Sequence, residues 1–131
     1  MADGIASLTP AIDKGVSAFI EDVESRGLGD QILLVITGEF GRTPRINKNG
    51  GRDHWGAAGS LFFTGGGVKT GQVIGKTDGH AARPTTRPYT PADVAATIYT
   101  ALGIDHREWV NDIQERPRQI LEHGRAIPEL F

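Results

Sequence analysis

The chain has 131 residues, 38% of them hydrophobic and 23% charged, and its 14 Lys+Arg against 16 Asp+Glu leave a formal net charge of -2. This length suits one domain around a single core, and the small negative charge argues against a nucleic-acid partner. The absence of cysteine excludes disulfides, thiolate zinc sites and thiol nucleophiles.

The first predicted element is an amphipathic helix that begins at Pro10, with Thr9 as its cap, and ends at Gly27 and Gly29. Apolar residues recur along it at helical spacing, at Ile12, Val16, Phe19, Ile20 and Val23. The ten residues MADGIASLTP lack the basic and apolar regions of a signal peptide, and no apolar run is long enough to span a membrane. The sequence as given therefore predicts a cytoplasmic protein with no membrane partner.

Three strands are predicted next. The segment QILLVIT (31–37) is apolar on both faces, which is typical of a central parallel strand covered by helices. SLFFTGGG (60–67) and QVIGKT (72–77) are predicted as shorter strands joined by a turn. The glycine run is not a phosphate-binding loop, because no Gly-Lys-Ser/Thr tripeptide occurs and a strand is predicted to follow.

A second helix is predicted in TPADVAATIYTALGI (90–104). Thr90 is its expected cap, Pro91 its first residue and Asp93 an acidic residue in its first turn, and Gly103 should end it. Three residues are expected to line its buried face: Val94, Ile98 and Leu102. In the tail, EWV and RQIL are expected to pack on the sheet edge, and EHGRA is expected to form a turn.

This order of elements predicts a single α/β domain over residues 1–131, with a mostly parallel sheet flanked by helices. Ligands of such sheets bind beyond the carboxyl ends of the strands. The loop of residues 38–56 follows the most apolar predicted strand, so we expect it to carry the site. The second long loop, with His80, Arg83 and Arg87, is positioned in the sequence where it can complete a cleft.

Glu39, Asp53 and His54 are the candidate catalytic residues of this loop. Glu39 can act as a metal ligand or general base, although it can equally cap a turn or pair with Arg42. Asp53 and His54 are adjacent and face opposite ways on extended backbone, so His54 is the stronger candidate, with a structural hydrogen bond as its alternative. Trp55 can stack on a sugar or anchor the loop on the core.

Four basic side chains against two acidic ones give this loop a local charge of +2: Arg42, Arg45, Lys48 and Arg52 against Glu39 and Asp53. An excess of positive charge favours an anionic group such as phosphate, sulfate or carboxylate, and arginine can bind it with two hydrogen bonds. For Lys48, a solvated position is an equally good interpretation.

The segments LLVITGEFGRTPRINKNGGRDHWG, LFFTGGGVKTGQVIGKTD and RPYTPADVAATIYTALGID together resemble the carboxyl-terminal part of a bacterial sulfatase-like family. It is the domain-of-unknown-function family 1501, common in planctomycetes and grouped with the alkaline phosphatase clan. The resemblance covers nearly the whole chain, and GEFGRTP together with GRDHWG is specific. It implies the carboxyl-terminal portion of an alkaline phosphatase/sulfatase-like fold and a hydrolase that acts on sulfate or phosphate esters.

The resemblance also implies metal positions. The clan carries an Asp-His-Gly signature, whose Asp and His bind one metal, and a later histidine that binds a second. Glu39 falls at the aspartate, Phe40 at the first histidine and His54 at the later one. Glu39 and His54 are therefore implied ligands of one divalent metal (zinc, calcium or magnesium). Phe40 cannot ligate, so a two-metal mechanism is not implied, and a site without metal is the alternative.

Family members are several hundred residues long, so the chain is expected to be a fragment or a short relative of a longer sulfatase-like protein. The clan takes its nucleophile and further metal ligands from the amino-terminal portion, which nothing here matches. A sheet edge left without its neighbour favours a homodimer.

Three hypotheses of function follow. The first is hydrolysis of a small anionic ester, with Glu39, Asp53 and His54 as catalytic residues and four substrate-binding residues: Arg42, Arg45, Arg52 and Trp55. The second is a metal-independent glycoside or ester hydrolase with paired carboxylates, Glu39 with Asp53 or Asp78, and Trp55 as a platform for a sugar. The third is a non-catalytic domain that binds an anion or a partner chain.

Overall fold

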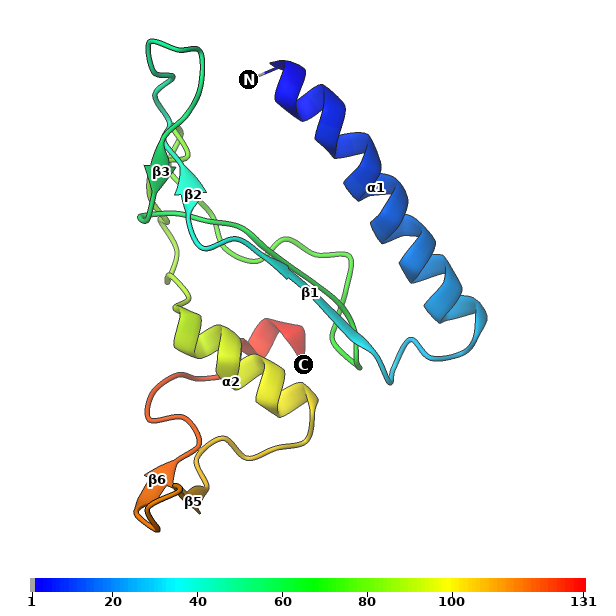
Figure 1. The fold of residues 1–131 in the computed structure, drawn as a ribbon, viewed down its shortest axis with the longest axis vertical. Helices are drawn as coiled ribbons and strands as arrows, with labels where there is room; N and C mark the ends of the chain where they lie inside the picture. The colour runs from blue at the N-terminus through cyan, green and yellow to red at the C-terminus, as the bar shows by residue number, and fades with distance from the viewer. Residues whose placement is uncertain (1) are drawn as a thin grey trace.

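The structure is a computed structural model that describes residues 2–131. In chain order its elements are α1 (Ala2–Ser25), β1 (Leu33–Thr37), β2 (Gly41–Arg42), β3 (His54–Trp55), β4 (Leu61–Gly65), α2 (Pro91–Ala101), β5 (Trp109–Asn111), β6 (Pro117–Gln119) and the 3-10 helix η1 (Pro128–Leu130). The strands form three separate antiparallel pairs, β1 with β4, β2 with β3 and β5 with β6 (Figure 1).

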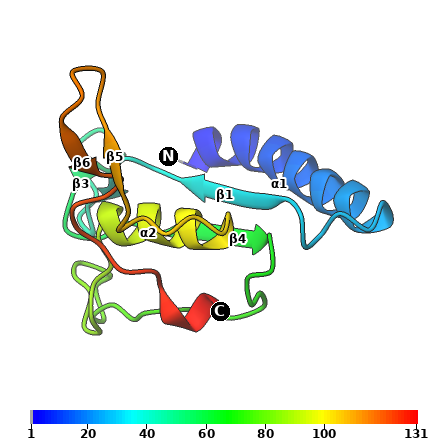
Figure 2. The same cartoon turned by 90° about the horizontal axis from the view of Figure 1, so that it is seen from below.

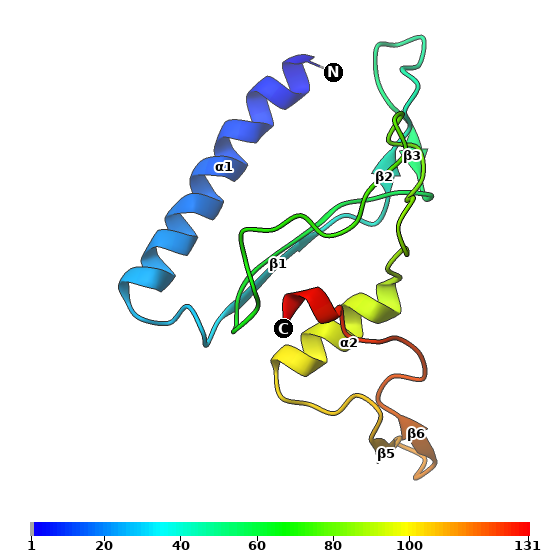
Figure 3. The same ribbon diagram turned by 180° about the vertical axis from the view of Figure 1, so that it is seen from behind.

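The prediction of a mostly parallel sheet is wrong. β1 pairs antiparallel with β4, with Leu33 opposite Gly65 and Thr37 opposite Leu61. α1 lies on one side of this pair, while α2 and η1 lie on the other, as Figures 1 and 3 show from opposite directions. A strand with helices on both sides has apolar residues on both faces whatever the direction of its partner. The apolar pattern therefore reflects the helices on both sides of β1, whose first three residues are half-buried, and not the sheet type.

α1 begins eight residues earlier than predicted and contains Pro10 within the helix. Ile5 and Leu8 continue the apolar spacing upstream of Ile12, so the amphipathic pattern runs through the proline. The predicted end of the helix is confirmed. Gly27 adopts a φ of +68°, and the N–H of Leu28 donates to the carbonyl of Val23 at 3.0 Å.

The strand predicted in SLFFTGGG is confirmed as β4, and a turn follows it. The strand predicted in QVIGKT is wrong: this segment is irregular apart from a bridge between Thr77 and Pro84. Gly71 and Gly75 have φ values of +74° and +84°, and such left-handed residues interrupt an extended strand.

α2 has the predicted cap. The Thr90 hydroxyl accepts a hydrogen bond from the N–H of Asp93 at 3.2 Å, and the Asp93 carboxylate accepts one from the N–H of Thr90 at 2.8 Å. Pro91 is the first helical residue, and Gly103, with a φ of +73°, follows the end of the helix.

The predicted buried face of α2 is wrong in part, since Val94 and Ile98 are only half-buried. Its buried residues are Asp93, Ala96 and Thr97, whereas Leu102 is exposed. The polar side chains on this face hold the carboxyl-terminal segment. Asp93 accepts from the N–H of Arg125 at 2.9 Å, and the Thr97 hydroxyl accepts from the N–H of Ile127 at 2.9 Å. A buried face can therefore be partly polar when each polar group has a partner.

The core lies between the β1–β4 pair, α2 and η1. Its buried residues are Val68, Ile127 and Leu130, and partly buried residues pack against them: Leu33, Phe63, Ile74 and Tyr89. The segments EWV and RQIL pair with each other as the β5–β6 hairpin, which projects from the body in Figures 1 and 2 and does not join β1 or β4. In residues 2–131, no helix is both long and apolar enough to cross a membrane.

Candidate functional site

The loop predicted to carry the site is organised by the β2–β3 pair. Gly41 lies opposite Trp55, and Arg42 lies opposite His54. A side chain at Gly41 would collide with the backbone carbonyl of Ala58, so this close approach requires glycine. The pairing brings together two candidate residues that are twelve positions apart in the sequence.

Phe40, Arg42 and His54 form one exposed group, here called the Phe40 cluster. The rings of Phe40 and His54 are stacked, with centroids 3.8 Å apart and an angle of 26° between the ring planes. The guanidinium carbon of Arg42 lies 5.7 Å from the centroid of the Phe40 ring. Stacked rings and cation–π pairs of this kind are attractive. In the sequence, Phe40 stands out only as a residue that cannot ligate a metal, and no local signal shows that it contacts His54.

Asp53 helps to close the loop. Its carboxylate accepts a hydrogen bond from the side-chain amide of Asn47 at 2.8 Å. Its backbone N–H donates to the hydroxyl of Thr43 at 3.1 Å, and its carbonyl accepts from the N–H of Thr43 at 3.0 Å. Asn47 also accepts from the N–H groups of Asn49 and Gly51, each at 3.0 Å. The turn-forming residues of NKNGG are the sequence signal for this arrangement.

The four basic residues of the loop divide into two kinds. Arg52 is half-buried and donates to the carbonyls of Thr43 and Pro44, both at 2.8 Å, so it braces the loop. Arg42, Arg45 and Lys48 are exposed. Among the described residues, none of these three has a carboxylate oxygen within 4.0 Å of its charged group. Arg42 Nη1 donates to the carbonyl of Arg52 at 3.4 Å, and the other side-chain donors of these three cations have no hydrogen-bond partner among the described residues.

Trp55 connects the loop to the second long loop. It is half-buried, and its Nε1 donates to the carbonyl of Ala82 at 2.7 Å. Asp78 orders the second loop by accepting from the N–H groups of Ala82 at 2.8 Å, His80 at 3.0 Å and Arg83 at 3.2 Å. The N–H of Ala82, foremost among these donors, lowers the pKa of Asp78 below its ordinary value. A carboxylate held ionised in this way is a poor general acid.

Glu39 is exposed just before the Phe40 cluster and forms no hydrogen bond or ion pair with other described residues. Within residues 5–131, whose side chains the structure describes, no group of three or more His, Asp or Glu is placed to hold a metal ion. Metal sites in proteins normally take at least three such ligands. Glu39 and His54 alone therefore do not form a complete metal centre.

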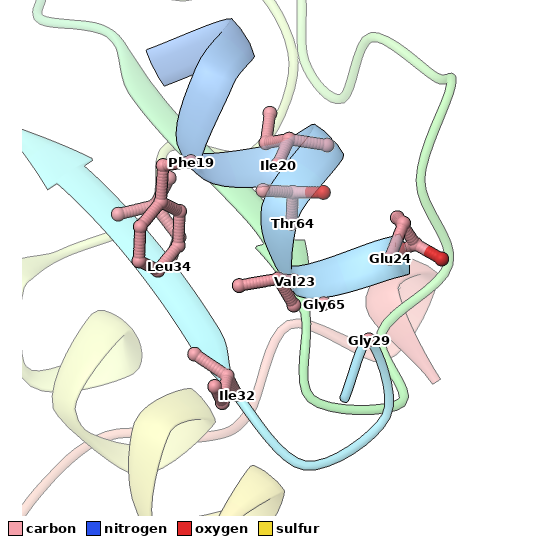
Figure 4. A pocket seen from close by; sticks show the side chains of 9 residues that line it. All are labelled: Phe19, Ile20, Val23, Glu24, Gly29, Ile32, Leu34, Thr64 and Gly65. Carbon is pink, nitrogen blue, oxygen red and sulfur yellow. The ribbon is translucent and has the colours of Figure 1, made fainter. Parts of the chain in front are cut away.

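Hollows in the surface lie near the start of β1. Figure 4 shows a shallow depression of about 10 Å³ beside the end of α1, where Phe19 and Val23 face Ile32 and Leu34. That volume holds at most one water molecule. A wider open groove of about 270 Å³ adjoins it and is lined by Glu24, Gly27, Gly29, Asp30, Thr64, Gly65, Gly67, Val68 and Thr70. Neither hollow includes a residue of the predicted site.

Comparison with known proteins identifies the family of the chain. No curated protein and no solved structure matches it. One family model, described as "Protein of unknown function (DUF1501)", matches residues 1–131. This match confirms the family to which the sequence was likened, and the description of that family states no activity. The chain belongs to the DUF1501 family of proteins.

Proposed function

We propose that the loop of residues 38–56 forms the anion-binding part of a hydrolytic site for sulfate or phosphate esters. One observation carries this assignment: Arg42, Arg45 and Lys48 are exposed on one loop and have no carboxylate partner among the described residues. Guanidinium groups match the geometry of tetrahedral oxyanions, to which they can donate two hydrogen bonds. The resemblance to the sulfatase-like clan supports the same class of substrate.

The residues of the loop would have different roles. Arg42 and Arg45 would bind the ester anion, Glu39 would accept a proton from the attacking water, and His54 would donate a hydrogen bond to the ester or its leaving group. Each of these side chains is exposed and available to a ligand. A metal at Glu39 and His54 would need ligands from outside this pair, so proton transfer by the chain's own residues is the step we propose.

Three further residues would support the shape of the loop: Asp53, Arg52 and Trp55. Asp53 is hydrogen-bonded to Asn47, and Arg52 to two loop carbonyls. Trp55 is hydrogen-bonded to Ala82. Side chains held by such contacts fix the shape of a loop, and a fixed loop presents its exposed cations in one arrangement.

Hydrolysis of nitrophenyl sulfates and phosphates tests the function. We expect Glu39→Gln and His54→Ala each to lower kcat/KM by about 100-fold, the usual contribution of general acid–base catalysis. Glu122→Gln and His123→Ala are matched controls, because both residues are exposed and lie far along the chain from the loop. A parallel assay with chelator reports any metal requirement. Equal turnover by wild type, Glu39→Gln and His54→Ala would refute the proposed site.

A second candidate function is self-association, and specific features favour it. Ile5, Leu8 and Ile12 on α1 are 57%, 65% and 60% exposed. β1 pairs only with β4 among the described strands, and a two-stranded sheet is marginally stable in water. β1 has no charged residue, so pairing it with β1 of a second copy brings no like charges together. We propose a homodimer that pairs through this edge.

The mass in solution, measured by light scattering after gel filtration, tests the homodimer. The wild type should elute as a dimer, and Ile36→Lys, which places a charge on β1, should give a monomer. Val73→Lys is the control, because Val73 is exposed in the irregular segment after β4. A monomeric wild type, or a dimer that both variants leave intact, would contradict pairing through β1.

A further inference from the structure

We infer that Phe40 is a positioning residue of the anion site: its ring holds the His54 imidazole and the Arg42 guanidinium side by side, so that both contact one oxyanion. This inference rests on the anion binding proposed for the loop. The stacked Phe40 and His54 rings, with centroids 3.8 Å apart, and the Arg42 guanidinium 5.7 Å from the Phe40 ring are the geometry that carries it.

The backbone explains why these three side chains meet. Phe40 lies in the bend that leads into β2, and this bend brings its ring to within 5.7 Å of the guanidinium carbon of Arg42. Directly opposite residues of an antiparallel pair have Cβ atoms about 4.5–5.5 Å apart, which places Arg42 beside His54. Gly41 allows the close packing against Ala58 that fixes this backbone.

Phe40 is 37% exposed, so it is not a buried anchor of the fold. Its contacts restrict the neighbouring side chains instead. Without the ring, the exposed Arg42 on β2 and the exposed His54 on β3 would lose more rotamer freedom when they bind a ligand. An aromatic ring that attracts both in advance reduces this loss and strengthens binding of the anion.

Phe40→Leu and Phe40→Tyr test the inference, with Phe62→Leu as a matched control. Phe62 is 42% exposed on β4, so its truncation removes a similar surface ring away from the loop. The first measurement needs no anion: carbon–proton NMR signals of the His54 ring, assigned with His54→Ala. The ring current of Phe40 should displace these signals in wild type, Phe40→Tyr and Phe62→Leu, and the displacement should disappear in Phe40→Leu.

The second measurement is titration of the same proteins with inorganic sulfate and inorganic phosphate. Phe40→Leu should weaken anion binding by about two- to tenfold, the factor that corresponds to one aromatic pair. Phe40→Tyr, which keeps an aromatic ring, should bind as the wild type does, and so should Phe62→Leu.

The outcomes separate the inference from the proposed function. Unchanged His54 signals or unchanged anion affinity in Phe40→Leu would overturn the positioning role, even if the wild type binds anions. A wild type that binds neither anion would overturn the proposed function, whereas the His54 signals would still report whether Phe40 fixes the ring.

Discussion

Asp93 is a buried carboxylate that joins the start of α2 to the carboxyl-terminal segment. One oxygen accepts from the N–H and the hydroxyl of Thr90, each at 2.8 Å, and the other accepts from the N–H of Arg125 at 2.9 Å. The N–H of Thr90 is the main reason that the pKa of Asp93 lies below its ordinary value of 3.8, and the N–H of Arg125 adds to it against the effect of burial. The ionised form is therefore the one that the fold stabilises.

Asp93→Ala should lower the free energy of unfolding by about 2–3 kcal/mol at neutral pH, because it leaves buried donors without an acceptor. A carboxylate whose pKa is lower in the folded state stabilises the fold fully above its unfolded pKa, and this contribution is lost as the pH falls through the folded pKa. The difference between wild type and variant should therefore shrink in acid. Urea unfolding at neutral and acidic pH measures it.

Asp13→Ala is the control for Asp93, since Asp13 is exposed on α1 and accepts no hydrogen bond from the described residues. It should unfold at nearly the wild-type urea concentration, as most exposed substitutions do. A loss for Asp93→Ala that stays the same from neutral to acidic pH would contradict stabilisation by the ionised carboxylate.

At the scale of elements, the sequence predicted what local chemistry determines. The cap of α2 is visible because Thr90, Pro91 and Asp93 are close together in the chain. The partner and direction of β1 are not local, because its apolar residues report covered faces and not the strand that supplies the hydrogen bonds. The same holds for the site. The sequence identifies His54 as a candidate by its residue type, but the stacking of His54 on Phe40 depends on the β2–β3 pairing.

The hydrogen bond from Trp55 to Ala82 makes the two long loops depend on each other. Trp55→Phe keeps a ring and removes only the Nε1 donor, so it should lower the free energy of unfolding by about 1 kcal/mol. Amide hydrogen exchange in residues 78–84 should become faster because the carbonyl of Ala82 loses its partner.

Trp109→Phe is a close control for Trp55→Phe, since Trp109 is 65% exposed on β5 and its indole N–H has no acceptor among the described residues. It should leave both the urea midpoint and exchange in residues 78–84 unchanged. Equal effects of the two tryptophan substitutions would show that the Ala82 hydrogen bond does not hold the loops together.

At the scale of the whole molecule, the carboxyl-terminal segment completes a small core. Among residues 5–131, the buried hydrophobic residues are Val23, Val68, Ala96, Ile127 and Leu130. Hydrogen bonds connect this segment to distant parts of the chain. The N–H of Lys69 donates to the carbonyl of Leu130 at 2.8 Å, and the N–H of Ile127 donates to the side-chain hydroxyl of Thr97. With a core of this size, one substitution can remove a large share of the free energy of unfolding, which is only about 5–15 kcal/mol even in ordinary domains.

Ile127→Ala should therefore affect the entire fold. Ile127 is 4% exposed, and truncating a buried isoleucine removes about 2–5 kcal/mol of stability, while Ile113→Ala at a residue 99% exposed should change almost nothing. Urea unfolding followed by far-ultraviolet circular dichroism and by tryptophan fluorescence measures both variants. The two signals should shift together in Ile127→Ala, because its side chain contacts a core shared by β1, β4 and the carboxyl-terminal segment. A shift in only one signal would mean that this segment detaches without unfolding the β1–β4 pair.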